Sequence, residues 1–406
     1  MIKKLVCAAA LATTVFAAAP ASAGKLQLGT LDCTIDGGTA YIVASNKGVS
    51  CVFRPSGTVH ILGGRIASSS VNYCEFVAIW EVRMKLAALL AVVASTALPV
   101  SVHGEAAGRI PEARAIRACT GAGAYWPTMT LALQENTAWV ACKERSRVLR
   151  LSLPRGRRTA TASLDGQVIA VTVGLGSVWA LDSGSTLYRI TSKTARVTKR
   201  IQVGAAAAYN IWIGAGSVWV ADDQGAAVLR VSPSSGRVVA RVPVGDGPAD
   251  MVFRGAQAWV VTHRDNTLYR IDTTTNAPKR LGVVGGGDDA AERLALLGDS
   301  LWITGRGIGM IEADPGTGAV RRTVDLDGTG IDVVAAAGAL WVPVRTAAVD
   351  RTGFPTMTAV RRVTADGTVS TVATARGRVD VHGLAAGLGS VWLADNTSGF
   401  LYRLPT

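Results

Sequence analysis

The sequence predicts an all-β fold, a ring of seven four-stranded blades closed by a strand from near its own beginning. Three observations lead to this prediction. Seven tryptophans recur 40, 40, 40, 43, 39 and 51 residues apart, four short strand patterns fill the intervals, and the last repeat stops one strand early. Of the 406 residues, 49% are hydrophobic and 17% charged, so the chain has ample apolar material for a core.

The repeat is anchored by a strand pattern that ends in tryptophan. The clearest copies are residues 176–179, 216–219, 256–259, 299–302 and 389–392, and weaker copies end at Trp139 and Trp341. A large ring at one strand position of every blade fills the wedge between neighbouring sheets. We therefore interpret these tryptophans as core between blades rather than as a ligand cage.

The fourth repeat shows all four strand patterns, at residues 250–253, 258–261, 268–271 and 280–283. Turn residues such as Asp265 and Asn266 separate them, and the apolar residues alternate with a period of two. Such a unit is typical of a β-propeller blade. The third strand carries a recurring arginine, which we interpret as a solvated, outward residue: Arg189, Arg230, Arg270 and Arg403.

Ring closure is expected at the two ends of the repeat region. The seventh repeat starts at Asp380 and has only three strands before Thr406, while residues 115–119 offer the missing outer strand. The interval of 51 residues predicts an insertion at about 347–358, which leaves six or eight blades as alternatives. We also predict a disulfide between Cys119 and Cys142, because the second and fourth strands of neighbouring blades end at the same channel entrance.

The first hundred residues predict a separate organisation. Residues 1–23 have the pattern of a signal peptide, with Lys3 and Lys4 before an apolar run. Residues 24–65 predict a fragment of a small β domain, a hairpin in which Cys33 faces Cys51, and 66–83 an unstructured linker. Residues 84–104 predict a second signal-like or anchor helix. Residues 105–406 predict the propeller itself. Either residues 1–83 and 84–406 are two secreted proteins joined by a gene fusion or an upstream-start error, or segment 85–102 anchors a two-part protein in a membrane.

Polar side chains gather where the inner strands are expected to begin, ten and nine residues before each tryptophan. These positions place one set of ligand-binding candidates around a single channel entrance: Tyr209, Asn210, Asp250, Glu292, Arg293, Asp332 and His382. Three residues after the tryptophans, on loops at the same entrance, are weaker metal candidates: Asp182, Asp222 and Asp395. Carboxylates with a histidine could hold Mg²⁺ or Ca²⁺ or perform acid–base chemistry. The alternative is that they are ordinary polar groups of turns and channel wall.

The repeats resemble those of bacterial extracytoplasmic propellers related to virginiamycin B (streptogramin) lyase and of forty-residue surface-repeat propellers. The family signature is G-S-V-W-V-A-D, then L-x-R-I/V, then a T/S-G-x-V turn; this chain matches it with residues 216–222, with Leu229 to Val231, and with S-G-R-V at 235–238. In the lyase family a histidine and glutamates act with magnesium on a cyclic depsipeptide ester, so the resemblance makes His382 the candidate catalytic residue. This chain has Asp in place of those glutamates. Residues 25–55, with L-x-C and C-x-F-x-P, resemble the start of a small secreted bacterial family of unknown function.

The expected function is a non-catalytic scaffold that binds a small molecule or a protein outside the cytoplasm, in the periplasm or after secretion. The alternative is a metal-dependent lyase or a lactonase-like hydrolase with its site at the channel entrance. No phosphate loop, zinc spacing or nucleophile elbow occurs. Net charge is +13, with 34 basic and 25 acidic residues from residue 105 onward, so anionic partners are expected. We expect a monomer, no nucleic acid, and membrane contact only through segment 85–102.

Overall fold

The computed structural model describes residues 29–35, 49–55, 108–119, 129–142, 146–285, 290–349 and 355–406, without side chains for 29–35, 49–55 and 346–356. The chain divides into two compact units, Met1–Leu98 and Pro99–Thr406. The predicted signal peptide, linker and second signal-like helix lie outside the described residues. Among the residues that are described, no helix is long and apolar enough to span a lipid bilayer.

The first unit contains an antiparallel pair, β1 (Gly29–Ile35) and β2 (Val49–Pro55). This is the predicted hairpin. Its register sets Cys33 directly opposite Cys51, the backbone alignment that a bridge requires. The bridge itself involves side chains outside the described ones, so it stays a prediction.

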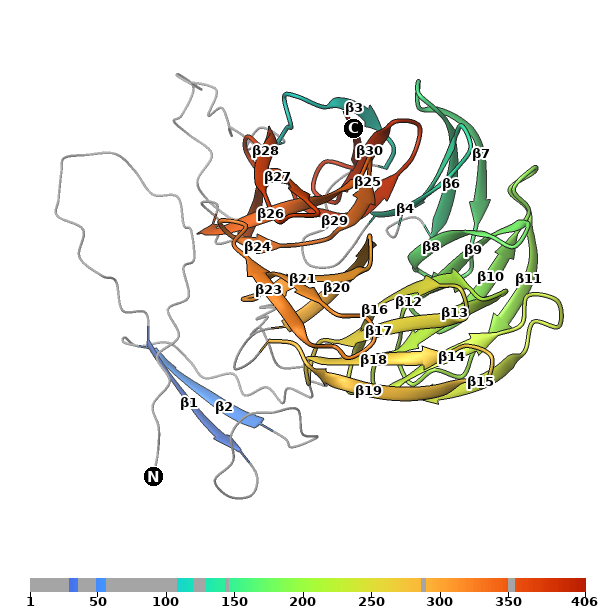
Figure 1. The fold of residues 1–406 in the computed structure, drawn as a ribbon, viewed down its shortest axis with the longest axis horizontal. Helices are drawn as coiled ribbons and strands as arrows, with labels where there is room; N and C mark the ends of the chain where they lie inside the picture. Colours follow the sequence, from blue (N-terminus) through green and yellow to red (C-terminus); the bar gives the residue numbers. More distant parts are fainter. Residues whose placement is uncertain are drawn as a thin grey trace, which may run out of the picture. The chain divides into compact units, whose positions relative to one another are not determined.

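The second unit is the predicted ring of seven blades, each an antiparallel sheet (Figure 1). Blade 1 has β4 (Met129–Gln134), β5 (Thr137–Cys142), β6 (Arg147–Ser152) and β7 (Arg157–Ser163). Blade 2 has β8 (Val168–Gly174), β9 (Ser177–Asp182), β10 (Thr186–Ile190) and β11 (Val197–Gln202). Blade 3 has β12 (Ala208–Gly214), β13 (Ser217–Asp222), β14 (Ala227–Val231) and β15 (Val238–Pro243).

The remaining blades follow the same order, from an inner first strand to an outer last one. Blade 4 has β16 (Pro248–Arg254), β17 (Gln257–Thr262), β18 (Thr267–Asp272) and β19 (Ala277–Val283). Blade 5 has β20 (Ala290–Leu297), β21 (Ser300–Arg306), β22 (Gly309–Ala313) and β23 (Val320–Val324). Blade 6 has β24 (Thr329–Gly330), β25 (Val334–Ala336), β26 (Ala339–Val349), β27 (Pro355–Thr364) and β28 (Val369–Thr374). Blade 7 has β29 (Val381–Ala386), β30 (Ser390–Asp395), β31 (Phe400–Pro405) and β3 (Arg114–Arg117).

Blade 7 closes the ring in the predicted way. Strand β3 supplies its outer strand and pairs antiparallel with β31, with Ile116 opposite Leu401. The hydroxyl of Tyr402 donates to the carbonyl of Gly108 at 3.0 Å, which ties down the start of the described ring. The disulfide Cys119–Cys142 joins blade 7 to blade 1, with Cα atoms 5.8 Å apart. Closure, blade count and this bridge are confirmed.

The insertion expected near 347–358 lengthens one hairpin rather than adding a blade. Strands β26 and β27 pair as far as Val349 and Pro355, so they extend beyond the corresponding strands of the other blades. Arg345 lies on this extension, at the end of the hairpin that faces the channel entrance.

The tryptophans fill the spaces between blades, as predicted. Trp179 of blade 2 packs with Ile211 and Val218 of blade 3. Around the ring the same relation holds until Trp392 of blade 7 packs against Met129 and Leu131 of blade 1. Each tryptophan therefore belongs to a hydrophobic cluster that continues into the next blade, and this pattern stabilises the whole ring rather than single sheets.

The recurring arginines are not the solvated residues that the sequence suggested. Each pairs in register with the tryptophan of its own blade, and the guanidinium of Arg230 lies over the Trp219 ring, 5.3 Å from its centre. Arg230 Nε donates to Ser217 Oγ at 2.8 Å, and Arg230 Nη1 donates to the carbonyl of Thr273 in the next blade at 2.5 Å. The interpretation was wrong for Arg230 and Arg189, because both half-buried side chains bond to a carbonyl of the next blade, whereas Arg403 bonds within its own blade.

Candidate functional site

The channel entrance is shaped by irregular first strands. The pairing of first and second strands slips at this end of five blades, for example between Ala208 and Ile211, between Pro248 and Asp250, and between Ala291 and Arg293. Such bulges re-aim side chains next to functional sites. The side-chain oxygens of Asn210, Asp250 and Asp332 accept the amide of the following residue at 2.9, 2.8 and 2.8 Å, which fixes their orientation.

Asp250 connects three blades at this entrance. Its Oδ1 accepts a hydrogen bond from Trp212 Nε1 of blade 3 at 2.8 Å, and its Oδ2 accepts the amide of Leu294 in blade 5 at 2.8 Å. Burial raises the pKa of Asp250 to about 6, and the nearby Asp332 adds to the rise, although Arg293 and the amide donors favour the ionised form. Asp250 is therefore a carboxyl group that exchanges its proton near neutral pH.

Arg293 lies between the two aspartates. Its Nε atom is 3.7 Å from Asp332 Oδ1, and the two side chains are 14% and 15% exposed. Arg293 Nη1 donates to the carbonyl of Glu292 at 2.8 Å. Burial raises the pKa of Asp332, whereas Arg293 and His382 lower it. The pair is close enough to attract but too far apart for a direct hydrogen bond.

His382 forms the blade 7 side of the entrance. Its Nε2 lies 3.1 Å from Asp380 Oδ1, and Arg345 Nη2 donates to the same oxygen at 2.8 Å. Burial alone would raise the pKa of Asp380, but the hydrogen bond and charge of His382, together with Arg345, hold it below its usual value. The imidazole is thus oriented by an ionised carboxylate.

A second group lies between blades 3 and 4, and the sequence pointed only to Tyr209 within it. The Tyr209 ring is 6.3 Å from the His263 ring, and His263 Nε2 is 3.8 Å from Asp223 Oδ1. Arg264 forms ion pairs with Asp223 and with Asp246. Burial lowers the pKa of His263, although Asp223 opposes this. This histidine is therefore neutral at pH 7.

The structure thus places Asp250, Arg293, Asp332 and His382 close enough for their charges to influence one another, at the one entrance that the counting from the tryptophans predicted. It adds Trp212, His263, Arg345 and Asp380, which that counting missed. The sequence could have indicated two of them, because Asp380 lies two residues before the predicted His382 and His263 lies four residues after the repeated Trp259. The binding and catalytic roles of the predicted residues stay predictions.

The three metal candidates have their oxygens engaged by the protein. Asp182 accepts the amides of Gly184 and Thr186 at 2.9 and 2.8 Å, and the Tyr188 hydroxyl at 2.8 Å. Asp395 accepts the amide of the following loop at Thr397, and Asp222 accepts the amide of Gly225 in its own loop and that of Ala206 before β12; Asp222 also forms an ion pair with an arginine. Within the described ranges, no group of three or more His, Cys, Asp or Glu side chains is placed to hold a metal ion. These contacts suit loop closure better than cation binding, and a metal role stays a prediction.

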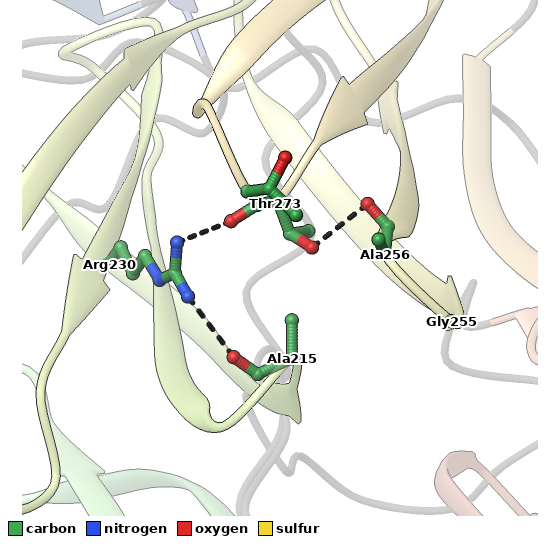
Figure 2. A pocket seen from close by; sticks show the side chains of 6 residues that line it. Ala215, Arg230, Gly255, Ala256 and Thr273 are labelled. Atoms are coloured by element: carbon green, nitrogen blue, oxygen red, sulfur yellow. Dashed lines mark hydrogen bonds between the residues drawn. The ribbon is translucent and has the colours of Figure 1, made fainter.

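A pocket of about 410 Å³ lies at the opposite end of blades 3 and 4 (Figure 2). It is lined by Arg230 and by the turns at Ala215, Gly255, Ala256, Thr273 and Thr274. Figure 2 shows Arg230 reaching the carbonyls of Thr273 and Ala215, while Thr273 Oγ1 donates to Ala256. The polar groups of this pocket therefore satisfy one another, which favours a structural role.

Comparison with solved structures agrees with the ring. The crystal structure of virginiamycin B lyase from Staphylococcus aureus matches with a TM-score of 0.58 at 16% identity, over 74% of this chain and 99% of that one. The two rings share a fold. A catalytically inactive histidine-to-alanine variant of that lyase with quinupristin matches with a TM-score of 0.57 at 14% identity, over 73% of this chain and all of the other. The computationally designed Ika8 protein matches with a TM-score of 0.53 at 10% identity, over 68% of this chain and 83% of that one.

The first unit gives a different match. Residues 12–71 match the family described as "Protein of unknown function (DUF992)". This agrees with the predicted resemblance of residues 25–55 to a small family of unknown function. A search of the curated proteins finds no match to the chain.

Proposed function

We propose that the propeller is a binding scaffold that takes a small polar ligand at the channel entrance, around Arg293. The observation that carries this proposal is the gap between Arg293 and Asp332. Two oppositely charged, largely buried side chains stand 3.7 Å apart without a direct hydrogen bond. A ligand oxygen can accept from the guanidinium while a ligand hydroxyl or amide donates to the carboxylate, which satisfies both groups.

The balance of charge at the entrance defines the ligand class. Asp250, Asp332 and Asp380 stand against Arg293 and Arg345. A strongly anionic ligand would meet more carboxylates than cations there, so we expect an uncharged or zwitterionic molecule with hydroxyl, amide or ester groups. The disulfide between blades supports a location in an oxidising compartment, outside the cytoplasm.

The test uses the fluorescence of Trp212, whose indole donates to Asp250 at the site. Emission is followed during titration with Mg²⁺, Ca²⁺, a simple lactone and a cyclic depsipeptide, and Trp212→Phe assigns the signal. We expect Arg293→Met and Asp332→Asn each to weaken binding about tenfold or more, since each removes one of the two charged groups that the ligand would bond and leaves the other charge buried without its counter-charge. Arg254→Met is the control and is expected to bind normally, because Arg254 lies in blade 4, at the end of β16 away from the channel entrance.

The outcomes separate clearly. An emission change that Arg293→Met removes and Arg254→Met keeps supports the entrance site. Binding that survives both Arg293→Met and Asp332→Asn would place the site elsewhere on the ring. Replacing Asp250 and Asp332 together by alanine is expected to abolish binding of any of these probes.

An enzyme is the second candidate, and the His382–Asp380 pair favours it. A histidine held 3.1 Å from a carboxylate can accept a proton from a substrate carbon or from water. The first case would break an ester by elimination, as in a lyase acting on a depsipeptide. The second would hydrolyse a lactone. Product formation from either probe that is lost in His382→Ala, while binding remains, would establish catalysis; binding without turnover supports the scaffold.

A further inference from the structure

The carboxylate of Glu292 lies at the channel entrance without a partner. Among the residues that the structure describes, the side chain of Glu292 forms no hydrogen bond and no ion pair, and only its backbone carbonyl is engaged, by Arg293. The pairing of β20 with β21 slips between Ala291 and Arg293, so Glu292 is the extra residue of a bulge and is half-buried. A partly buried charge without a partner is costly, which indicates a partner from outside the chain.

A second oxygen without a partner belongs to Asp223, on the loop after β13. Asp223 Oδ1 is buried and takes part in no hydrogen bond within the described ranges. The other oxygen of this carboxylate is paired with Arg264, which also pairs with Asp246 Oδ1 at 2.8 Å. One arginine therefore serves two carboxylates, and Asp223 Oδ1 keeps its full capacity to accept.

His263 relates these two carboxylates to each other. Its Nε2 is 3.8 Å from Asp223 Oδ1, which is too long for a hydrogen bond. Burial lowers the pKa of His263, and the charges of Asp223 and Glu292 oppose this, so both carboxylates lie within electrostatic reach of one imidazole. Gly247 packs so closely on the ring that an added Cβ would be 2.8 Å from His263 Cε1. A neutral, fixed imidazole cannot balance the two negative charges.

The group adjoins Arg293, the centre of the proposed ligand site. Strand β16 lies between β12 and β20 at the channel, and Glu292 and Arg293 are consecutive, with Cα atoms about 3.8 Å apart. Although burial opposes it, the pKa of Arg293 is raised by Tyr209 and by the surrounding carboxylates, Glu292 included. The Tyr209 ring is in turn 6.3 Å from the His263 ring. A negative region and a buried cation therefore lie next to each other.

The geometry suits an ammonium group better than a metal ion. A metal ion needs oxygen donors that converge on one point at about 2.0–2.6 Å. In the part of the chain that the structure describes, no three His, Cys, Asp or Glu side chains are placed in that way. An ammonium group donates three hydrogen bonds in different directions, at about 2.7–2.9 Å to carboxylates, so its acceptors need not converge.

We propose that Glu292 and Asp223 bind the ammonium group of a ligand whose neighbouring carbonyl oxygen accepts from Arg293. We call Glu292 and Asp223 the amine subsite. It rests on the proposed function and narrows the ligand to an α-aminoacyl compound, such as an amino acid or its amide. The added positive charge satisfies both carboxylates, which the protein leaves without a bond.

The test uses two probes that differ only in the amine, alaninamide and propionamide. Each is titrated into the full chain at pH 7 in a calorimeter, with the amine of alaninamide largely protonated. We expect alaninamide to bind about tenfold or more tightly than propionamide, because a hydrogen bond to a charged group contributes about that factor. Glu292→Gln should remove this preference by weakening alaninamide alone.

Two variants control for effects other than the lost charge. Glu135→Gln removes the same charge from an exposed turn between β4 and β5, at the opposite end of the ring, and should bind both probes as the wild type does. Glu292→Asp keeps the charge and should retain most of the preference. Since the Glu292 carboxylate makes no bond to a described group, Glu292→Gln should melt at the wild-type temperature.

The results separate this subsite from the proposed function. Equal binding of the two probes, or a preference that persists in Glu292→Gln, would overturn the amine subsite; if Arg293→Met still weakens both probes, the proposed function stands. Binding that Arg293→Met leaves unchanged would overturn the proposed function, whereas a preference lost in Glu292→Gln would still support the amine subsite. Absence of alaninamide binding up to about 10 mM would also overturn the subsite, while the lactone titration decides the proposed function by itself.

Discussion

Asp250 makes the channel entrance sensitive to pH, and Trp212 reports on it. The carboxyl accepts hydrogen bonds from Trp212 Nε1, the Met251 amide and the Leu294 amide, all at 2.8 Å. Burial raises its pKa from 3.8 to about 6. The perturbation is therefore a pH change across this value, with Asp250→Asn as the variant that cannot titrate.

The magnitude follows from that shift. A rise of about two pKa units corresponds to about 3 kcal/mol. Because the folded state holds the proton more tightly than the unfolded chain, Asp250 makes the protein less stable as the pH rises from about 4 to above 6. Burial lowers the pKa of His263, so this histidine contributes in the opposite direction: it adds stability as the pH rises toward its unfolded value. The difference between wild type and Asp250→Asn isolates the Asp250 contribution.

The assay combines urea unfolding with tryptophan emission between about pH 4 and 8. We expect the wild type to lose about 3 kcal/mol more than Asp250→Asn over this range, and its Trp212 emission to titrate near pH 6. In Asp250→Asn the new amide faces the Leu294 N–H, which costs about 1–3 kcal/mol at every pH and leaves the slope unaffected. Parallel pH profiles for the two proteins, or a titration that persists in Asp250→Asn or Trp212→Phe, would refute the reasoning.

Three further predictions concern the ring. Reducing the Cys119–Cys142 bridge should lower the free energy of unfolding by about 3 kcal/mol, measured in denaturant with and without reductant; an unchanged midpoint would contradict this. Deleting residues 1–104 should leave the melting temperature of the ring unchanged in calorimetry, and a large drop would show that the first unit supports it. Arg230→Ala should cost about 2–3 kcal/mol, whereas Arg270→Ala, at the same register position opposite its tryptophan, should cost below about 1 kcal/mol. Equal losses would mean that burial of the aliphatic part of the arginine, and not its bonds to the next blade, accounts for the stabilisation.

The fold could be predicted because its main signals are local and repeated. A tryptophan every forty residues and strands of period two define the blade, and a missing strand at one end matches a spare strand at the other. The observed closing strand, Arg114–Arg117, begins one residue before the expected segment and ends two residues earlier. Strand ends depend on hydrogen bonds that a pattern does not show, so such differences are ordinary.

The bonds of Arg230 to the next blade could not be predicted from strand periodicity, because alternation shows only on which face of its sheet a side chain lies. The carbonyl and the amide that hold Arg230 belong to Thr273 and Asn276, which are 43 and 46 residues later. That distance is about one repeat, so it appears only once neighbouring blades are placed side by side. In blade 5 a different residue places a cation over the tryptophan. Glu312 lies at the register position opposite Trp302, and it pairs with Arg322 of the outer strand, which lies over the Trp302 ring.

At the site, counting from the tryptophans located the inner-strand residues but not those on loops. Asp250, Arg293 and His382 keep a fixed distance from a repeated strand. Arg345 lies on the extended hairpin of blade 6, where the interval grows to 51 residues and the count no longer applies. The orientation of the predicted residues depends on bulges, which have no sequence pattern of their own here.

Composition gives the excess of basic residues only for the protein as a whole, whereas the structure shows that the channel entrance and the rim differ in charge. At the channel entrance carboxylates outnumber arginines, and Asp332 faces Arg293 directly. On the rim, the outer strands carry cations without a single acidic residue. The basic excess of the composition therefore lies on the rim, and we expect the ligand proposed for the channel entrance to be selected by hydrogen bonding rather than by net charge. It follows that replacing the exposed rim arginines Arg155, Arg157 and Arg158 by glutamine should leave binding at the entrance unchanged, because the rim and the entrance use separate sets of charges.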